Sequence, residues 1–261
     1  CEPVNQNLME LLIMIDAAKR ASARSIVAVI PWYAYSRQDR KTKPREPITA
    51  RLVAKMIRVA GADRVMTMDL HVGQIEGFFS FPVDHLTAMH TFVDYFTDQG
   101  FKDAEDAVVV APDTGEAKVA KHLADHLGLP WAIVNKVRRE PGQSEVTHVI
   151  GDVAGRRAVM IDDLIDTAGT LCGAADRLIE EGATEVSAVA THGVFSGPAY
   201  ERIEASKLKE VVVADTLPLK EDEPQSKIRT LTIAPILAST IQNVFTDESV
   251  SEVFMGENQL F

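Results

Sequence analysis

The sequence has 261 residues, of which 46% are hydrophobic and 25% are charged. This composition is typical of a folded protein with one or two domains, and it excludes a disordered or collagen-like chain. The only cysteines, Cys1 and Cys172, exclude a disulfide framework and favour a cytoplasmic protein. The longest uncharged run, 230–246, is too short and too polar for a transmembrane helix, so no membrane partner is expected.

The net charge of −11 repels a nucleic-acid backbone at long range, so nucleic acid is not an expected partner. One segment, from Arg37 to Arg58, is nevertheless rich in lysine and arginine, and its first part contains Pro44 and Pro47. A cationic loop on an acidic protein fits a small polyanion, such as the phosphate tail of a nucleotide.

Short apolar runs alternate with amphipathic segments along the chain. Apolar runs that are hydrophobic on both faces and separated by helices predict parallel sheets covered by helices, which is an α/β fold. A weak repeat, in which 61–71 resembles 182–192, suggests two similar domains with a boundary near 86–88. Strands are predicted at 25–31, 64–70, 107–111, 131–135, 157–161, 186–191 and 210–214, and helices at 7–21, 48–60, 115–127, 170–181 and 198–206.

The strongest chemical signal lies at 157–170. An apolar strand leads into the adjacent carboxylates Asp162 and Asp163 and then into a helix that begins with small residues. Backbone amides at such a helix start bind phosphate well. Two adjacent carboxylates are costly to bury without partners, whereas sugar hydroxyls and Mg²⁺ suit them. The pattern therefore predicts one loop that holds both a phosphate and a ribose diol.

These residues resemble the phosphoribosyl-diphosphate motif that phosphoribosyltransferases share with ribose-phosphate diphosphokinases. Segments 35–41, 68–79 and 191–199 are similar to signatures of the diphosphokinases, the phosphoribosyl-diphosphate synthetases. The resemblance implies two phosphoribosyltransferase-like domains with mainly parallel sheets flanked by helices. Their expected ranges are 1–87 plus 245–261, and 88–244. The resemblance also implies that this sequence begins after the N-terminal part that family members usually have.

By this resemblance, the chain transfers the diphosphoryl group of ATP to the C1 hydroxyl of ribose 5-phosphate, releases AMP, and uses Mg²⁺. Arg37, Gln38 and His71 match positions that bind ATP. His71 and Asp113 match ligands of the magnesium ion on the ATP phosphates. The residues that match the ribose 5-phosphate site are Asp162, Asp163, Asp166, Thr167, Ala168, Gly169 and Thr170.

The resemblance further implies catalytic, regulatory and assembly features. Lys136 and Arg138 match a catalytic Lys-x-Arg at the start of a loop, 137–147, that we expect to close over ATP. The family assembles as homohexamers with sites completed across subunits, so we expect a cytoplasmic homo-oligomer. Phosphate and ADP are the expected effectors, at a site formed by Lys41, Lys43, Arg45, Ser249, Ser251 and Phe254.

Two other functions stay open at this point. A phosphoribosyltransferase would need a nucleobase-binding hood, and the sequence provides no such segment. A non-catalytic subunit associated with the synthetase would keep the fold without the activity, although Lys136 and Arg138 argue against it. Glu116 departs from the family pattern, which commonly has glycine there, and a carboxylate at that position would repel phosphate.

Overall fold

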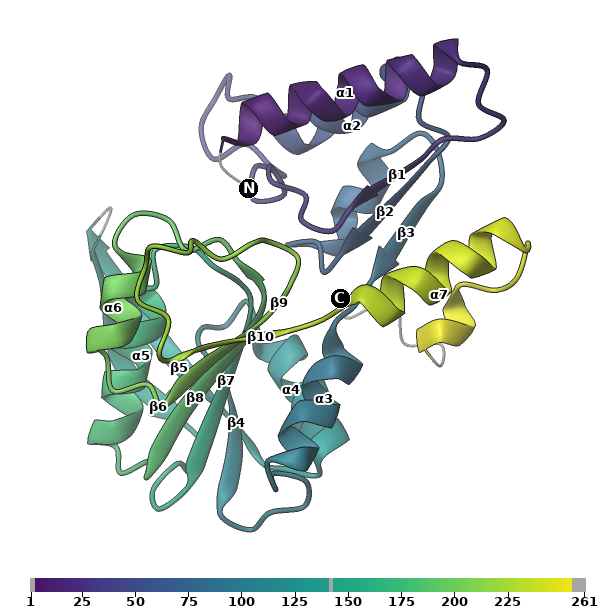
Figure 1. Ribbon diagram of the computed structural model, residues 1–261. Helices are drawn as coiled ribbons and strands as arrows, with labels where there is room; N and C mark the ends of the chain where they lie inside the picture. The colour runs from purple at the N-terminus through teal and green to yellow at the C-terminus, as the bar shows by residue number, and fades with distance from the viewer. Residues whose placement is uncertain (1–2, 141–142, 255–261) are drawn as a thin grey trace. The chain divides into compact units, whose positions relative to one another are not determined.

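The computed structural model describes residues 3–140 and 143–254, with the side chains of 136–140, 143–147, 252 and 254 left out. The chain forms two compact units (Figure 1). Unit 1 consists of two stretches of the chain, one that ends at Thr87 and one that begins at Ile236, and unit 2 contains Ala88–Pro235. The sequence places this return at 245. The difference arises because the apolar run near 230–246 forms a helix, α7 (Ala234–Phe245), most of which belongs to unit 1.

Unit 1 contains a three-stranded parallel sheet in the order β1-β2-β3. Helices α1 and α2 lie together on one side of this sheet (Figure 1), and their apolar residues, including Ile15 and Ile57, form a core with Val65 of β2. The elements are α1 (Val4–Arg20), β1 (Val27–Ile30), α2 (Thr49–Ala60), β2 (Arg64–Met68), η1 (Gly73–Phe78), β3 (Val83–Leu86), α7 and η2 (Ser251–Phe254).

Unit 2 contains a seven-stranded sheet in the order β10-β9-β8-β7-β4-β5-β6. Neighbouring strands are parallel except β5 and β6, which form an antiparallel pair. Helices α3 and α4 cover one face, and α5 and α6 cover the other (Figure 1). The elements are α3 (Met89–Asp98), β4 (Ala107–Ala111), α4 (Ala117–Leu127), β5 (Trp131–Glu140), β6 (Gln143–Ile150), β7 (Arg157–Ile165), α5 (Gly169–Glu180), β8 (Glu185–Gly193), α6 (Ala199–Ala205), β9 (Glu210–Ala214) and β10 (Ile228–Leu231).

The centre of this sheet follows directly from the sequence pattern. Every residue of β4 is buried, as expected for a central strand with helices on both faces. Helix α4 buries Val119, Leu123 and Leu127, which recur every four residues on one side of the helix. Gly128 ends α4 in the left-handed conformation, with φ 66°. The α/β class with mainly parallel sheets is therefore confirmed.

Two predictions for the functional segments are wrong. The expected loop at 137–147 is part of a hairpin, because β5 and β6 pair along Asn135 to Glu140 and Gln143 to His148. The strand expected at 157–161 continues through Ile165, because the neighbouring strand β8 pairs with it as far as Ile165 and Gly193. Asp162 and Asp163 consequently lie on a strand rather than in a turn.

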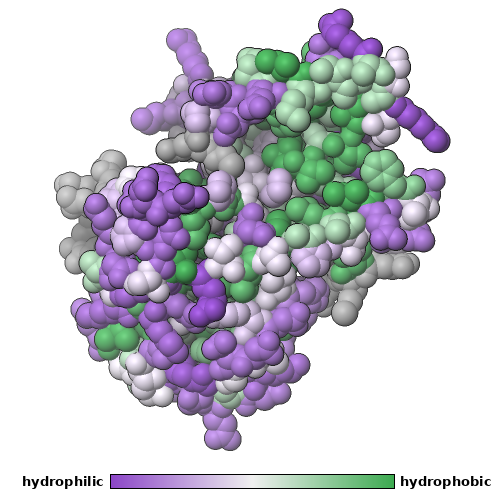
Figure 2. All heavy atoms as spheres, viewed as in Figure 1, coloured by the Kyte–Doolittle hydropathy of each residue, from purple (hydrophilic) through white to green (hydrophobic). Residues whose placement is uncertain are grey.

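The surface of unit 1 carries an apolar area that is absent from the predictions. Figure 2 shows hydrophobic side chains gathered over this unit. Its exposed hydrophobic residues include Met9, Ile13 and Met14 of α1, Val29 of β1, and Leu52 and Val59 of α2. Within the described ranges, no helix combines the length and apolar character needed to cross a bilayer.

Candidate functional site

The chemistry-bearing residues of unit 2 lie after two neighbouring strands. β4 and β7 pair in parallel, with Val110 opposite Met160. Asp113 follows the end of β4, and Asp162 and Asp163 lie near the end of β7. The carboxyl ends of parallel strands meet at one edge of a sheet, where ligands bind in open α/β folds. The register therefore brings these carboxylates to the same edge.

Glu116, Asp162 and Asp163 form an acidic cluster whose ligand oxygens lie within 4.8 Å of one another. Glu116 is the N-cap residue of α4. Asp113 lies in the same turn, where its Oδ1 accepts a hydrogen bond of 2.8 Å from the Gly115 amide. Burial raises the pKa of Asp162 well above its usual value, and the negative charges of Asp163, Glu116 and Asp113 raise it further.

This donor set fits Mg²⁺. Carboxylate oxygens are the ligands that a hard cation prefers. Like charges this close oppose one another, and a bound dication would neutralise that repulsion. The same repulsion adds to the effect of burial in raising the pKa of Asp162. The structure supports a cation-binding edge in unit 2 without identifying the ion.

The turn between β7 and α5 leads directly into the start of a helix, where backbone amides can bind an anion. It consists of Asp166, Thr167 and Ala168, and α5 begins at Gly169. Ala168 is buried in the left-handed conformation, with φ 58°, which is a strained backbone for alanine. The first N–H groups of a helix have no intrahelical acceptor, so the amides of Gly169 and Thr170 are oriented for an anion. Thr167, Gly169 and Thr170 are exposed, as a binding turn requires.

A second segment holds this turn in place. The Ser196 hydroxyl donates a hydrogen bond to the Asp166 carboxylate, and the Ser196 amide donates to the Asp166 carbonyl at 3.0 Å. Arg202 of α6 donates to the Thr167 carbonyl at 2.9 Å. The segment after β8 is itself closely packed, because a Cβ on Gly193 would lie 2.6 Å from the Phe195 ring. The turn is thus fixed from outside as well as by its own sequence.

In unit 1, Arg37 and Gln38 lie in the connection that follows β1. Both are exposed. The Gln38 carbonyl accepts a hydrogen bond of 3.3 Å from the Ala50 amide at the start of α2. The buried Tyr33 hydroxyl donates to the Ala50 carbonyl at 2.8 Å. These contacts anchor the turn and leave the Arg37 and Gln38 side chains at the surface.

His71 follows the neighbouring strand, β2, so it lies at the same sheet edge as the connection after β1. The loop around it is held by the buried His85 of β3. The Leu70 amide donates to His85 Nε2 at 2.9 Å, so the ring proton is on Nδ1, which donates to Glu76 at 2.7 Å. Asp69 has a φ of 34°, which turns the backbone immediately before this loop.

Lys136 and Arg138 lie on β5, opposite Val146 and Ser144 of β6. Their side chains are outside the described part of the structure, so the geometry of the predicted catalytic pair is untested.

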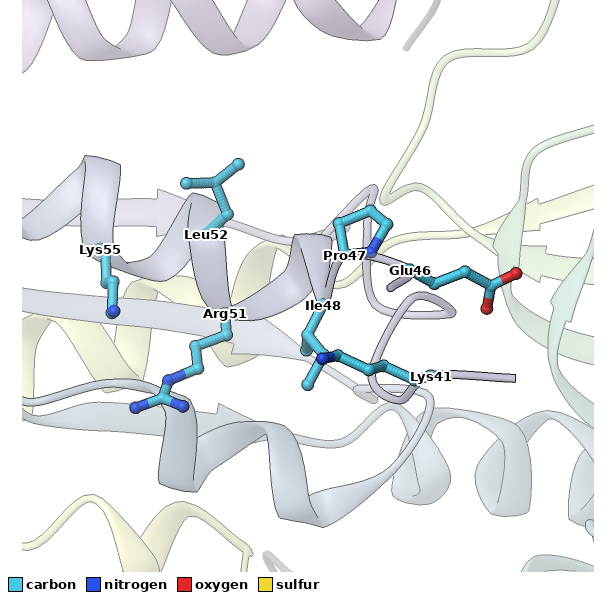
Figure 3. Close-up of a pocket in the computed structure, with 7 residues that line it drawn as sticks. All are labelled: Lys41, Glu46, Pro47, Ile48, Arg51, Leu52 and Lys55. Atoms are coloured by element: carbon cyan, nitrogen blue, oxygen red, sulfur yellow. The ribbon is translucent and has the colours of Figure 1, made fainter. Parts of the chain in front are cut away.

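A shallow pocket of about 300 Å³ lies at the start of α2 in unit 1. Figure 3 shows the nitrogen ends of Lys41, Arg51 and Lys55 on one side of the helix, whereas the Glu46 carboxylate points away from them. Glu46 accepts hydrogen bonds from Thr42 and from the Lys43 amide, and these bonds hold the pKa of its carboxyl below the usual value.

Of the predicted effector residues, Lys41 lines this pocket, and Lys43 and Arg45 are exposed in the same loop. Ser249 and Ser251 lie in the C-terminal part of unit 1 and are exposed. Phe254 ends η2, and its side chain is not described. The predicted effector site would combine two segments of unit 1, the loop at 41–45 and the segment at 249–254. The structure describes each of these segments by itself.

Sequence reasoning missed several supporting residues. Arg202 and His85 each donate to or accept from one of the two predicted binding loops, and each acts on a segment at least 15 residues away in the chain. Ser196 lies in a segment that the resemblance singles out, yet its contact with Asp166 appears only in the structure. The sequence shows that Glu116 departs from the family pattern. Only the structure shows that Glu116 lies beside Asp162 and Asp163.

Comparisons with known proteins agree over nearly the whole chain. A family model described as the N-terminal domain of ribose phosphate pyrophosphokinase matches residues 1–61. A second, described as the phosphoribosyl synthetase-associated domain, matches residues 139–255.

Among curated proteins, the ribose-phosphate pyrophosphokinase of Clostridium acetobutylicum is 53% identical, over 98% of this chain and 80% of that protein. The enzyme of the same name from Caldanaerobacter subterraneus is 54% identical, over 97% of this chain and 80% of that protein. The crystal structure of phosphoribosylpyrophosphate synthetase from Mycobacterium smegmatis matches with a TM-score of 0.88 and 48% identity, over 94% of this chain and 80% of that one.

Proposed function

The chain belongs to the ribose-phosphate pyrophosphokinases, and from that premise we propose how its residues divide the work of the reaction. Its function is to transfer the diphosphoryl group of ATP to the C1 hydroxyl of ribose 5-phosphate, which yields 5-phosphoribosyl 1-diphosphate and AMP. The two alternatives, a phosphoribosyltransferase and a non-catalytic associated subunit, are not favoured, because the similar curated proteins are named as pyrophosphokinases.

The turn after β7 is the proposed ribose 5-phosphate site. The amides at the start of α5 and the hydroxyls of Thr167 and Thr170 would bind the 5-phosphate. Asp162 and Asp163 would accept hydrogen bonds from the ribose hydroxyls. One observation carries this proposal. The turn after β7, which Ser196 and Arg202 hold by hydrogen bonds, lies at the same sheet edge as the acidic cluster. Holding the sugar in one orientation favours attack by its C1 hydroxyl.

Arg37, Gln38 and His71 are the proposed ATP-binding residues. His71 of unit 1 and Asp113 of unit 2 are each proposed as a ligand of Mg²⁺. When bound, Mg²⁺ supplies charge neutralisation to the phosphate oxygens. The guanidinium of Arg37 would bind a phosphate oxygen, and His85 would position the loop of His71 through the Leu70 amide. This role of His85 is one of support, because its ring nitrogens are engaged by Leu70 and Glu76.

Lys136 and Arg138 are the proposed catalytic cations. Their charges would stabilise the negative charge that develops on the transferring diphosphoryl group. Replacing each with alanine should lower kcat far more than it raises KM for either substrate. Equal effects on kcat and KM would contradict a role confined to the transition state.

The primary experiment measures AMP release from ATP with and without ribose 5-phosphate, in Mg²⁺, on the full chain. We expect release that depends on the sugar phosphate, with 5-phosphoribosyl 1-diphosphate as the coupled product. A Thr167→Val variant removes one proposed phosphate donor and should raise KM for ribose 5-phosphate, while Thr184→Val, at a distant turn, is the matched control. AMP release that is independent of the sugar would overturn the proposal.

The regulatory, assembly and localisation features remain proposals as well. The pocket with Lys41, Arg51 and Lys55 is suited to an anion such as phosphate or the diphosphate of ADP. The exposed apolar area of unit 1 supports a homo-oligomer, the family's hexamer being the expected form. Light scattering on the purified chain tests the assembly, and substrates of central metabolism support a cytoplasmic location.

A further inference from the structure

Three of the seven histidines gather in unit 2, away from the acidic cluster. His122 and His126 lie one helical turn apart on α4, and His90 lies in the first turn of α3. Helices α3 and α4 pack against each other. All three side chains are partly exposed, although the Nε2 atom of His90 is buried.

The geometry of the α4 pair is that of two ligands facing one point. The His122 and His126 rings are stacked, with centroids 4.7 Å apart and an interplanar angle of 14°. Their Nε2 atoms are 2.9 Å apart. Two nitrogens at this distance share one proton, so one ring donates and the other offers its lone pair. Histidines four residues apart on a helix present both nitrogens to a single metal ion.

A metal ion in place of the shared proton requires little movement. With zinc–nitrogen bonds of about 2.0–2.1 Å at a tetrahedral angle, two ligand nitrogens lie about 3.3 Å apart. The two Nε2 atoms would therefore separate by only a few tenths of an ångström. The His90 ring lies edge-on to His126, with centroids 5.5 Å apart. The nitrogens of the three histidines do not all lie within 4.8 Å of one another, so the His90 ring would have to rotate to become a third ligand.

The electrostatic setting also favours a cation. His126 lies in the last turn of α4, where the helix dipole is negative. Lys121, on the same helix, forms an ion pair with Asp125, which reduces its repulsion of a cation. Asp94 follows His90 by one turn of α3 and is exposed.

We propose that His90, His122 and His126 form a binding site for a transition-metal dication of the Zn²⁺ class. Imidazole nitrogen selects zinc, nickel, copper or cobalt over Mg²⁺, which prefers oxygen. The site is distinct from the acidic cluster. Counted along α4 from Glu116, His122 is about 9 Å away and His126 about 15 Å away. A bound ion would link α3 to α4 and fix the first turn of α3.

The test is a Zn²⁺ titration of the metal-free full chain by calorimetry, in excess Mg²⁺ so that the oxygen sites are occupied. We expect wild-type protein to bind one more equivalent of Zn²⁺ than His122→Ala/His126→Ala. His90→Gln should weaken that equivalent by about tenfold, at the lower end of what losing even an outer-shell partner costs. His148→Ala, which removes an exposed histidine of β6, is the matched control and should bind as wild type does.

Two further measurements keep the proposal falsifiable if a variant folds poorly. Substituting Co²⁺ in wild-type protein should produce the visible absorption of nitrogen-ligated cobalt, and this absorption should be missing in the double variant. At a Zn²⁺ concentration 100-fold above Kd, the Tm of wild type should rise by about 5–10 °C. An unchanged Zn²⁺ stoichiometry in the double variant, an unchanged affinity in His90→Gln, or a wild-type cobalt complex without such absorption would each overturn the proposal.

Discussion

Replacing Glu116 with glutamine should stabilise the metal-free protein. The change removes one negative charge from the acidic cluster and keeps the shape of the side chain. Two unit charges 4.8 Å apart repel by about 0.9 kcal/mol in a water-like dielectric and by about 3.5 kcal/mol at an effective value of 20. The cluster is half-buried, so we expect a gain of about 1–3 kcal/mol, which corresponds to a Tm increase of about 2–10 °C.

The assay is urea unfolding in EDTA, followed by tryptophan fluorescence. The chain has two tryptophans, Trp32 in unit 1 and Trp131 in unit 2. In a Trp32→Phe background, Trp131 reports on the unit that contains the cluster. The exposed Glu221 provides a matched control, because Glu221→Gln removes the same charge far along the chain.

Saturating Mg²⁺ should reduce the gain, since a bound cation already neutralises the repulsion. A midpoint for Glu116→Gln no higher than that of wild type in EDTA would refute the electrostatic reasoning. A gain of the same size with and without Mg²⁺ would refute the placement of Glu116 in a cation-binding cluster.

Three further outcomes are expected. His85→Ala leaves the Leu70 amide without its acceptor, so the free energy of unfolding should fall by about 1–3 kcal/mol in urea titrations and KM for ATP should rise. Ser196→Ala should raise KM for ribose 5-phosphate by about tenfold or more in steady-state assays, with an unchanged KM for ATP. The pKa of Asp162 is raised in the folded state, so its contribution to stability is present below pH 4 and is lost as the pH rises through the raised value. Asp162→Asn should therefore be more stable than wild type at neutral pH in EDTA, and an advantage that grows on acidification would contradict this sign.

The sequence predicts the central strands well, because a strand buried on both faces consists almost entirely of apolar residues. β4, for example, is apolar throughout and is flanked by amphipathic helices. The short strands β3 and β10 are missed, because Val83–Leu86 and Ile228–Leu231 each place two polar residues between two apolar ones and so lack the alternation of a strand. Their pairing depends on neighbouring strands. Helix α7 is missed because Pro235 and the polar residues of 239–243 obscure a pattern in which Leu237, Ile241 and Val244 recur at helical spacing.

The candidate site divides in the same way. The phosphate turn after β7 can be predicted, since all of its residues are contiguous and carry a recognisable pattern. The acidic cluster cannot, because Glu116 reaches Asp162 only through the register of β4 with β7. The hairpin of β5 and β6 is also hidden, since Lys136 to Glu140 are polar enough to suggest a loop until their partners in β6 are known.

The contact from α6 to the Thr167 carbonyl has a practical consequence for this enzyme. Helix α6 has seven residues and lies outside the turn itself, yet Arg202 helps to determine how rigid that turn is. Variation in α6 is therefore a route by which related chains can adjust their grip on a phosphorylated pentose without altering any group that touches it. Engineering that changes only the residues of the turn itself would leave this contact from α6 unused.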